Sequence, residues 1–215
     1  MKLGVVLDTH GYPRNPKARN TVAVKIGMVS DTHGFFDPRL AELLEGVEVI
    51  LHGGDVGSLP VLDELRRIAE VDAVRGNVDS PALGLPPSLT RRFAGVQIEM
   101  KHILPVPQSK LEQWAREAVP SKDQAARREA FLGNFEPATR VVIFGHSHEP
   151  CLLVLGGKLF INPGSAGRRR FSLPRCCGLA EISPVAITAT IQLLERYNGK
   201  VPVDIQLDLE PSRPR

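Results

Sequence analysis

The chain has 215 residues, of which 42% are hydrophobic and 24% charged, so it can bury one core without disulfides or a structural metal. A formal charge of only +3 and an aromatic content of 5% argue against a nucleic-acid partner, which needs clustered cations and stacking rings. No apolar run approaches the roughly 18 residues that cross a bilayer, so we expect no membrane partner.

The cysteines and the N-terminal segment predict a cytoplasmic protein. Three cysteines, two of them adjacent, cannot form a disulfide framework, and we expect Cys151, Cys176 and Cys177 to be buried thiols in a reducing compartment. Asp8 and His10 interrupt the N-terminal apolar residues, so no signal peptide is predicted.

The first part of the chain alternates between strand and helix patterns. Apolar runs predict strands over 25–30, 47–52 and 71–74. Helices are expected over 37–44 and 59–69, the first with Asp37 as N-cap and Pro38 at the first helical position. This alternation indicates a layered α/β fold.

The later part of the chain reads mainly as strands. Residues 89–93 and 96–102 predict one hairpin, 151–155 and 158–161 a second, and a further strand covers 141–144. We expect antiparallel strands over 179–182, 186–194 and 201–209 to close a second sheet.

One segment of the later part, 105–137, is charged and carries helical patches at 110–119 and 122–134. It is interpreted as a solvated helical excursion, a lid over the substrate or a dimer contact.

The N-terminus contains a near-repeat. Residues 2–11, KLGVVLDTHG, match residues 25–34, KIGMVSDTHG, at seven of ten positions. A helix and a second strand follow only the second copy at normal spacing, so we divide the chain into an extension over 1–23 and a domain over 24–210. The first copy is an extra edge strand, a disordered extension, an arm swapped to a partner, or the result of a misplaced start, with Val24 as the natural first residue.

Carboxylate and imidazole side chains follow the ends of the Val- and Ile-rich runs. The candidate metal ligands are Asp31, His33, Asp55, Asn77, His102, His146 and His148. Six of these seven are carboxylate or imidazole groups, the chemistry that holds two divalent ions side by side over a phosphate ester.

The spacing of these residues suggests how they share two ions. Asp31 and His33 are two residues apart, so on a strand they would point to the same face and hold one ion. Asp55 follows two glycines that allow close approach, which makes it the natural bridge between the ions. His146 and His148 could each face a different ion.

The candidate ligands belong to five motifs, SDTHG (30–34), HGGD (52–55), RGNVD (75–79), GHSH (145–148) and NPGS (162–165). In order and spacing these motifs resemble the calcineurin-like metallophosphoesterases, and within them the small bacterial and archaeal phosphodiesterases related to Vps29. The resemblance covers roughly 24–182. It implies a four-layer α/β/β/α sandwich of two mixed β-sheets flanked by helices, with the metals at the ends of the central strands.

The resemblance also implies a division of the ligands and a reaction. Asp31, His33, Asp55 and His148 would hold one ion, and Asp55, Asn77, His102 and His146 the other. A bridging water or hydroxide would be the nucleophile, and Asp55, Asn77 and His102 would also take part in catalysis. We expect two divalent ions, Mn²⁺ first, although Fe²⁺, Ni²⁺, Co²⁺ and Zn²⁺ also suit these ligands.

Two positions depart from the family pattern. Ile103 follows His102 where the family usually has glycine, which makes the local turn atypical. Val78 follows Asn77 where many relatives carry a histidine that protonates the leaving group, so the general acid is unidentified. We therefore expect a preference for esters with good leaving groups.

Three functions follow from these observations. The first is a metal-dependent phosphodiesterase acting on a small or nucleotide-like diester, and the second is a phosphomonoesterase on the same site. The third is a Vps29-like binding scaffold without catalysis, from which loss of ligands would be expected. The expected partners are a small-molecule phosphate ester and a second copy of the chain in a homodimer.

Four groups outside the predicted ligands have two interpretations each. His52 is expected to orient ligands more than to react, and Asp79 to stabilise a turn more than to donate a proton. Residues 162–165 either support a histidine or form a plain turn. Residues 168–170, three arginines, either attract an anion or form a solvated basic loop.

Overall fold

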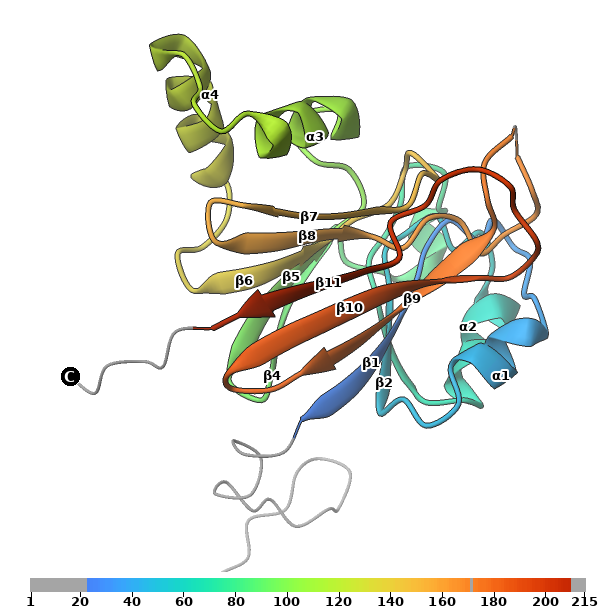
Figure 1. Cartoon of the computed structure of the whole chain (residues 1–215). Coiled ribbons are helices and arrows are strands. Elements are labelled where there is room, and N and C mark those ends of the chain that lie inside the picture. The colour runs from blue at the N-terminus through green and yellow to red at the C-terminus, as the bar shows by residue number, and fades with distance from the viewer. Residues whose placement is uncertain (1–22, 171, 210–215) are drawn as a thin grey trace, which may run out of the picture.

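The computed structural model describes residues 23–170 and 172–209, which form two mixed β-sheets packed face to face (Figure 1). The near-repeat at 2–11 lies outside the described residues. No helix among the described residues is long and apolar enough to cross a membrane.

The first sheet has six strands in the order β11-β10-β9-β1-β2-β3. Its parallel half is β1 (Val24–Val29), β2 (Val49–His52) and β3 (Glu70–Ala73). Its antiparallel half is β9 (Cys176–Ile182), β10 (Ala186–Leu193) and β11 (Asp204–Asp208). The expectation that the last three strands close a second sheet is wrong, because β9 pairs directly with β1 and extends the first sheet.

The second sheet has five strands in the order β4-β5-β6-β8-β7. These strands are β4 (Ser88–Phe93), β5 (Val96–Lys101), β6 (Thr139–Ile143), β7 (Cys151–Leu155) and β8 (Lys158–Asn162). The antiparallel pairs β4–β5 and β7–β8 confirm both predicted hairpins. The three central strands β5, β6 and β8 are parallel.

Alternation along the central strands divides the core between two faces of each sheet. In β2, Val49 and Leu51 face the opposite sheet, whereas Ile50 packs under the helices. In β6, Val141 and Ile143 face the opposite sheet, whereas Val142 packs outward. Each sheet is therefore buried on both faces and needs a helical layer outside it.

Helices supply the two outer layers (Figure 1). On the first sheet lie α1 (Arg39–Leu43) and α2 (Leu59–Arg66), and on the second α3 (Gln108–Arg116) and α4 (Lys122–Leu132). A short 3₁₀ helix, Pro81–Leu83, follows β3. The four-layer α/β/β/α sandwich expected from the sequence is confirmed.

The helical segment at 105–137 forms the fourth layer. Leu111, Trp114 and Phe131 are buried against Phe160 of β8, so the segment completes the core of the second sheet. Its role as a lid or dimer contact stays a prediction.

The first helix begins later than predicted. Pro38 is the N-cap, and the Asp37 carboxylate accepts a hydrogen bond from the Arg39 backbone N–H at 3.0 Å. The same carboxylate pairs with Arg175, which is 7% exposed and also donates to the backbone oxygen of Gly167. This ion pair therefore joins the start of α1 to the loop before β9.

We expect Asp37→Asn to destabilise the fold by about 2 kcal/mol at neutral pH, because the buried Arg175 would lose its hydrogen-bonded carboxylate and keep only Glu195, 3.7 Å away. The Arg39 and Arg175 guanidinium groups outweigh burial and hold the pKa of Asp37 well below its ordinary value of 3.8. The stabilisation is therefore complete above pH 3.8 and is lost as the pH falls toward the native-state pKa. Urea unfolding at several pH values measures the difference; a difference independent of pH would contradict this account.

Candidate metal centre

The carboxyl ends of the parallel strands of both sheets meet at one edge of the sandwich. Each predicted ligand lies just beyond such an end: Asp31 and His33 after β1, Asp55 after β2, Asn77 after β3, His102 after β5, and His146 and His148 after β6. All seven residues predicted from the sequence are thus brought to one side of the molecule by strand direction alone.

Left-handed backbone turns bring the ligands together after the strands end. Among the described residues six non-glycines have positive φ, and five of them are predicted ligands: Asp31, His33, Asp55, His146 and His148. This conformation is strained for such residues and is concentrated at functional sites. Asp31 and His33 were expected to share the face of a strand, and this is wrong. The strand β1 ends at Val29, and left-handed turns orient both side chains.

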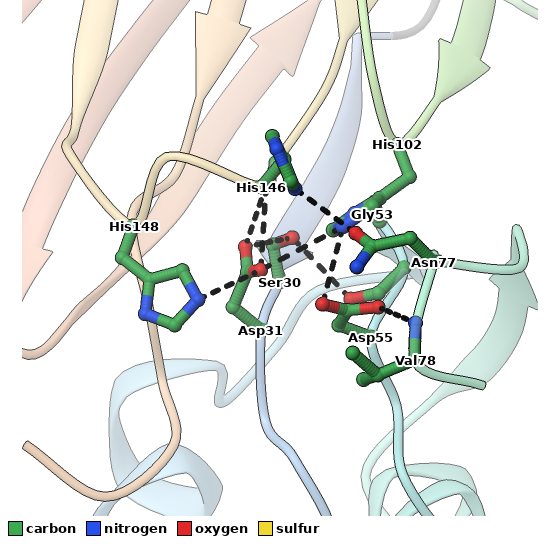
Figure 2. A network of polar contacts seen from close by, with 12 residues as sticks. Ser30, Asp31, Gly53, Asp55, Asn77, Val78, His102, His146 and His148 are labelled. Atoms are coloured by element: carbon green, nitrogen blue, oxygen red, sulfur yellow. Dashed lines mark hydrogen bonds and ion pairs between the residues drawn. The ribbon is translucent and has the colours of Figure 1, made fainter. Parts of the chain in front are cut away.

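One group of ligand atoms consists of Asp31, His33 and His148, whose atoms lie within 4.8 Å of one another. The two Nε2 atoms of His33 and His148 are 3.1 Å apart. His148 Nε2 also lies 3.2 Å from Asp31 Oδ1 (Figure 2). Nitrogen ligands at the usual 2.0–2.1 Å from one ion are separated by about this distance. With His33 Nε2 and Asp31 Oδ1 4.0 Å apart, the three atoms are spaced closely enough to contact one ion.

A second group consists of Asp31, Asp55 and His102, again within 4.8 Å. His102 Nε2 lies 3.3 Å from Asp55 Oδ2 and 3.9 Å from Asp31 Oδ1. Asp55 Oδ2 also lies 3.9 Å from His33 Nε2. Both carboxylates therefore lie between the two groups, whereas the two glycines before Asp55 predict that Asp55 alone bridges them.

Asn77 and His146 complete the second group on its exposed side. Asn77 Oδ1 and His146 Nδ1 are 2.9 Å apart, and the His146 and His102 rings are 5.4 Å apart (Figure 2). Two histidine pairs, His33 with His148 and His102 with His146, thus flank the two carboxylates.

Burial of the two carboxylates favours positive charge between them. Asp31 is fully buried and Asp55 is 3% exposed. In the described part of the chain only histidines, and no Lys or Arg, lie within ion-pair distance of either one. Burial opposes ionisation of Asp55, but the nearby His102 ring and the hydrogen bond from the Val78 N–H outweigh it and lower the pKa of Asp55 to about 2.

The ring of His102 is held with one nitrogen toward the carboxylates. His102 Nδ1 donates to the Gly53 carbonyl at 2.8 Å, which leaves the buried Nε2 without a hydrogen-bond partner and facing the carboxylates. Burial lowers the pKa of His102, but the nearby Asp55 and Asp31 outweigh it and raise that pKa, so positive charge is favoured at this nitrogen. Burial and the charge of Arg170 lower the pKa of His33, which keeps its ring neutral.

Glycines make room for this dense cluster. A Cβ on Gly145 would lie 2.1 Å from Ser30 Oγ and 2.7 Å from Asp31 Oδ2. A Cβ on Gly76 would lie 2.0 Å from Asp55 Oδ1. The orphaned His102 nitrogen, the two buried carboxylates and these close approaches fit a pair of divalent cations.

Buried residues behind the ligands hold their loops in place. His52 Nε2 lies 2.9 Å from Thr32 Oγ1, and its Nδ1 accepts from Gly54 N–H at 3.2 Å; burial lowers its pKa to about 4. Asp79 accepts backbone hydrogen bonds from Gly76, Val56 and Gly57. Both residues therefore position neighbouring loops, as the sequence analysis expected.

The turn at 162–165 supports the histidine loop. Asn162 is fully buried and donates to the Gly145 carbonyl and to Ser147 Oγ. The Gln108 side-chain oxygen accepts from both Asn162 and Ser147, so α3 braces the same loop. Sequence reasoning missed Gln108, because no motif surrounds it and only the packing of α3 brings it to the site.

The remaining motifs lie at the margin of the site or in the core. Arg168 lies over the Phe35 ring at 4.6 Å, and Arg169 pairs with Glu195 at 3.7 Å. All three cysteines are free and buried, as expected, and burial raises the pKa of Cys176 and of Cys177 to about 12.

Comparison with known proteins agrees with this geometry. Residues 24–184 match the model of the calcineurin-like phosphoesterase superfamily domain. The chain belongs to this superfamily. A probable metallophosphoesterase of Methanothermobacter thermautotrophicus is 31% identical over 174 residues, which are 81% of this chain and 82% of that protein.

Two solved structures share the fold. Vps29 of Entamoeba histolytica, crystallised with Zn²⁺, has a TM-score of 0.59 and 23% identity, covering 86% of this chain and 99% of that one. The structure of a novel archaeal phosphodiesterase has a TM-score of 0.53 and 23% identity, covering 74% of this chain and 99% of that one.

Asp31 belongs to both groups of candidate ligands, and this leads to a prediction about metal binding. Asp31→Asn should weaken binding of both ions, by about a hundredfold or more, whereas His148→Ala should weaken only one, because His148 belongs to a single group. Calorimetric titration of chelator-stripped protein with Mn²⁺ measures both affinities. Asp63→Asn, at an exposed carboxylate on α2, is the control. Equal effects of the first two variants would contradict the shared role of Asp31.

Proposed function

We propose that the protein is a dinuclear metal-dependent phosphodiesterase that hydrolyses a small or nucleotide-like phosphodiester. The observation that carries the proposal is the pair of buried carboxylates, Asp31 and Asp55, flanked by two histidine pairs at one edge of the sandwich. Asp31, His33, His148 and Asp55 would hold one ion, and Asp55, Asn77, His102 and His146 the other, with Asp31 close to both. Mn²⁺ is our first choice among the divalent ions that suit these ligands.

When bound, the two ions would supply an activated water as nucleophile and neutralise phosphate oxygens. The chain's own residues position this chemistry. The Gly53 carbonyl fixes the tautomer of His102, and the Asn162 side chain holds the loop that carries His146 and His148. Asn77 is exposed, and its amide could donate a hydrogen bond to the phosphate.

A diester is favoured over a monoester by the surroundings of the site. Val78 and Ile103, each next to a proposed ligand, are 58% and 48% exposed. Apolar side chains at these positions suit a second ester arm better than the additional charge of a monoester dianion.

The alternative is a Vps29-like scaffold without catalysis. The likeness to Vps29 favours it, and because one Vps29 was crystallised with Zn²⁺, metal binding alone does not separate the two functions. Turnover does.

The proposal is tested by hydrolysis of bis(p-nitrophenyl) phosphate by chelator-stripped protein, with and without Mn²⁺. We expect Mn²⁺-dependent cleavage that exceeds cleavage of p-nitrophenyl phosphate and disappears in Asp55→Asn. Folding of the variant is checked by circular dichroism. Absence of turnover by folded wild-type protein with any of Mn²⁺, Fe²⁺, Ni²⁺, Co²⁺ or Zn²⁺ would move the scaffold function to first place, and a preference for the monoester would make the protein a phosphomonoesterase.

The valine after Asn77 leads to a second prediction. Without an imidazole there to protonate the leaving group, kcat should fall steeply as the leaving group becomes more basic. Val78→His should raise cleavage of phenyl esters by about tenfold to a hundredfold, with little effect on p-nitrophenyl esters, because only the poor leaving group needs a proton. Steady-state rates for a series of substituted aryl diesters measure this dependence; equal slopes in wild type and variant would contradict it.

A further inference from the structure

A cavity of about 300 Å³ opens beside the exposed histidine of the metal centre. It is formed by the segment between β5 and α3 and by the loop after β6, and its lining includes Ile103, Val106, Gln108, His146 and Ser147. Because His146 belongs to both the cavity and the metal centre, an occupant of the cavity would adjoin a phosphate held at the metals.

The lining offers apolar contact and no fixed charge. No Asp, Glu, Lys or Arg is among the lining residues, and Ile103 presents a 48% exposed side chain. The polar side chains of Gln108 and Ser147 are committed elsewhere, since Ser147 Oγ donates to Gln108 Oε1 at 2.8 Å and Gln108 Nε2 donates to the Glu149 carbonyl at 3.2 Å. A charged or strongly polar group would lose its hydration here without finding a partner.

We propose that this cavity is a substrate subsite that receives an uncharged, apolar ester arm of the phosphodiester, an inference that rests on the proposed function. Ile103 is its specificity-determining residue. The phosphate itself lies at the metal centre, and the arm extends past His146 against Ile103 and Val106. An arm that carries further phosphate groups is disfavoured, because the lining supplies no cation.

The test compares binding of diphenyl phosphate and dimethyl phosphate to the Mn²⁺-loaded protein by calorimetry. Both are diester monoanions, and they differ in the apolar area of their arms. We expect the wild type to bind diphenyl phosphate about tenfold more tightly or better, since hydrophobic contact in a pocket gives differences of this size.

Variants assign the preference to the cavity. Ile103→Ser should weaken the binding of diphenyl phosphate by about tenfold and leave the binding of dimethyl phosphate unchanged. Ile103→Leu should keep the preference for diphenyl phosphate. Val119→Ser is the matched control, because Val119 is an exposed valine that is 91% accessible and does not line the cavity.

Equal affinity of the wild type for the two ligands would overturn the subsite. An equal loss of affinity for the two phosphodiesters in Ile103→Ser would also overturn the subsite, since that result indicates a disturbed His102 or metal centre. Failure of the proposed function is seen separately: absence of diester hydrolysis together with a preserved preference for diphenyl phosphate would overturn the catalytic role and support the subsite.

Discussion

The placement of two buried carboxylates next to each other is the constraint on which the rest of the site depends. Asp31 and Asp55 have ligand oxygens within 4.8 Å of each other and almost no exposure to solvent. Two such anions in a protein interior need compensating positive charge, and the described residues around them supply only imidazoles. The raised pKa of His102 and the lowered pKa of Asp55 are two consequences of that need.

The fold creates this arrangement through strand direction and local turns together. Parallel strands of two sheets end at one edge, and left-handed turns then direct Asp31, His33 and Asp55 toward His146 and His148. Glycine is required where the backbone passes close to the buried carboxylates, as at Gly76 beside Asp55 and Gly145 beside Asp31. The outer helices contribute indirectly: α3 carries Gln108, whose hydrogen bonds brace the loop of His146 and His148.

The sequence was sufficient for the layered architecture, both hairpins and the seven residues that meet at the strand ends, because these depend on local patterns and on motif order. It was insufficient where long-range packing decides the outcome. The pairing of β9 with β1 has no local signal, and neither has the contact of Gln108 with Ser147 and Asn162. Asp31 also belongs to both ligand groups, which depends on turn geometry that spacing alone does not determine.

The central claim is that the two carboxylates hold two cations between two histidine pairs. A crystal structure of the Mn²⁺-loaded protein, with anomalous diffraction at the manganese edge, tests this claim most directly. The account requires two peaks about 3.5–4 Å apart, one between His33 and His148 and the other beside His102 and His146, with Asp31 and Asp55 between them. A single peak, or peaks that leave His102 Nε2 without a ligand role, would contradict it.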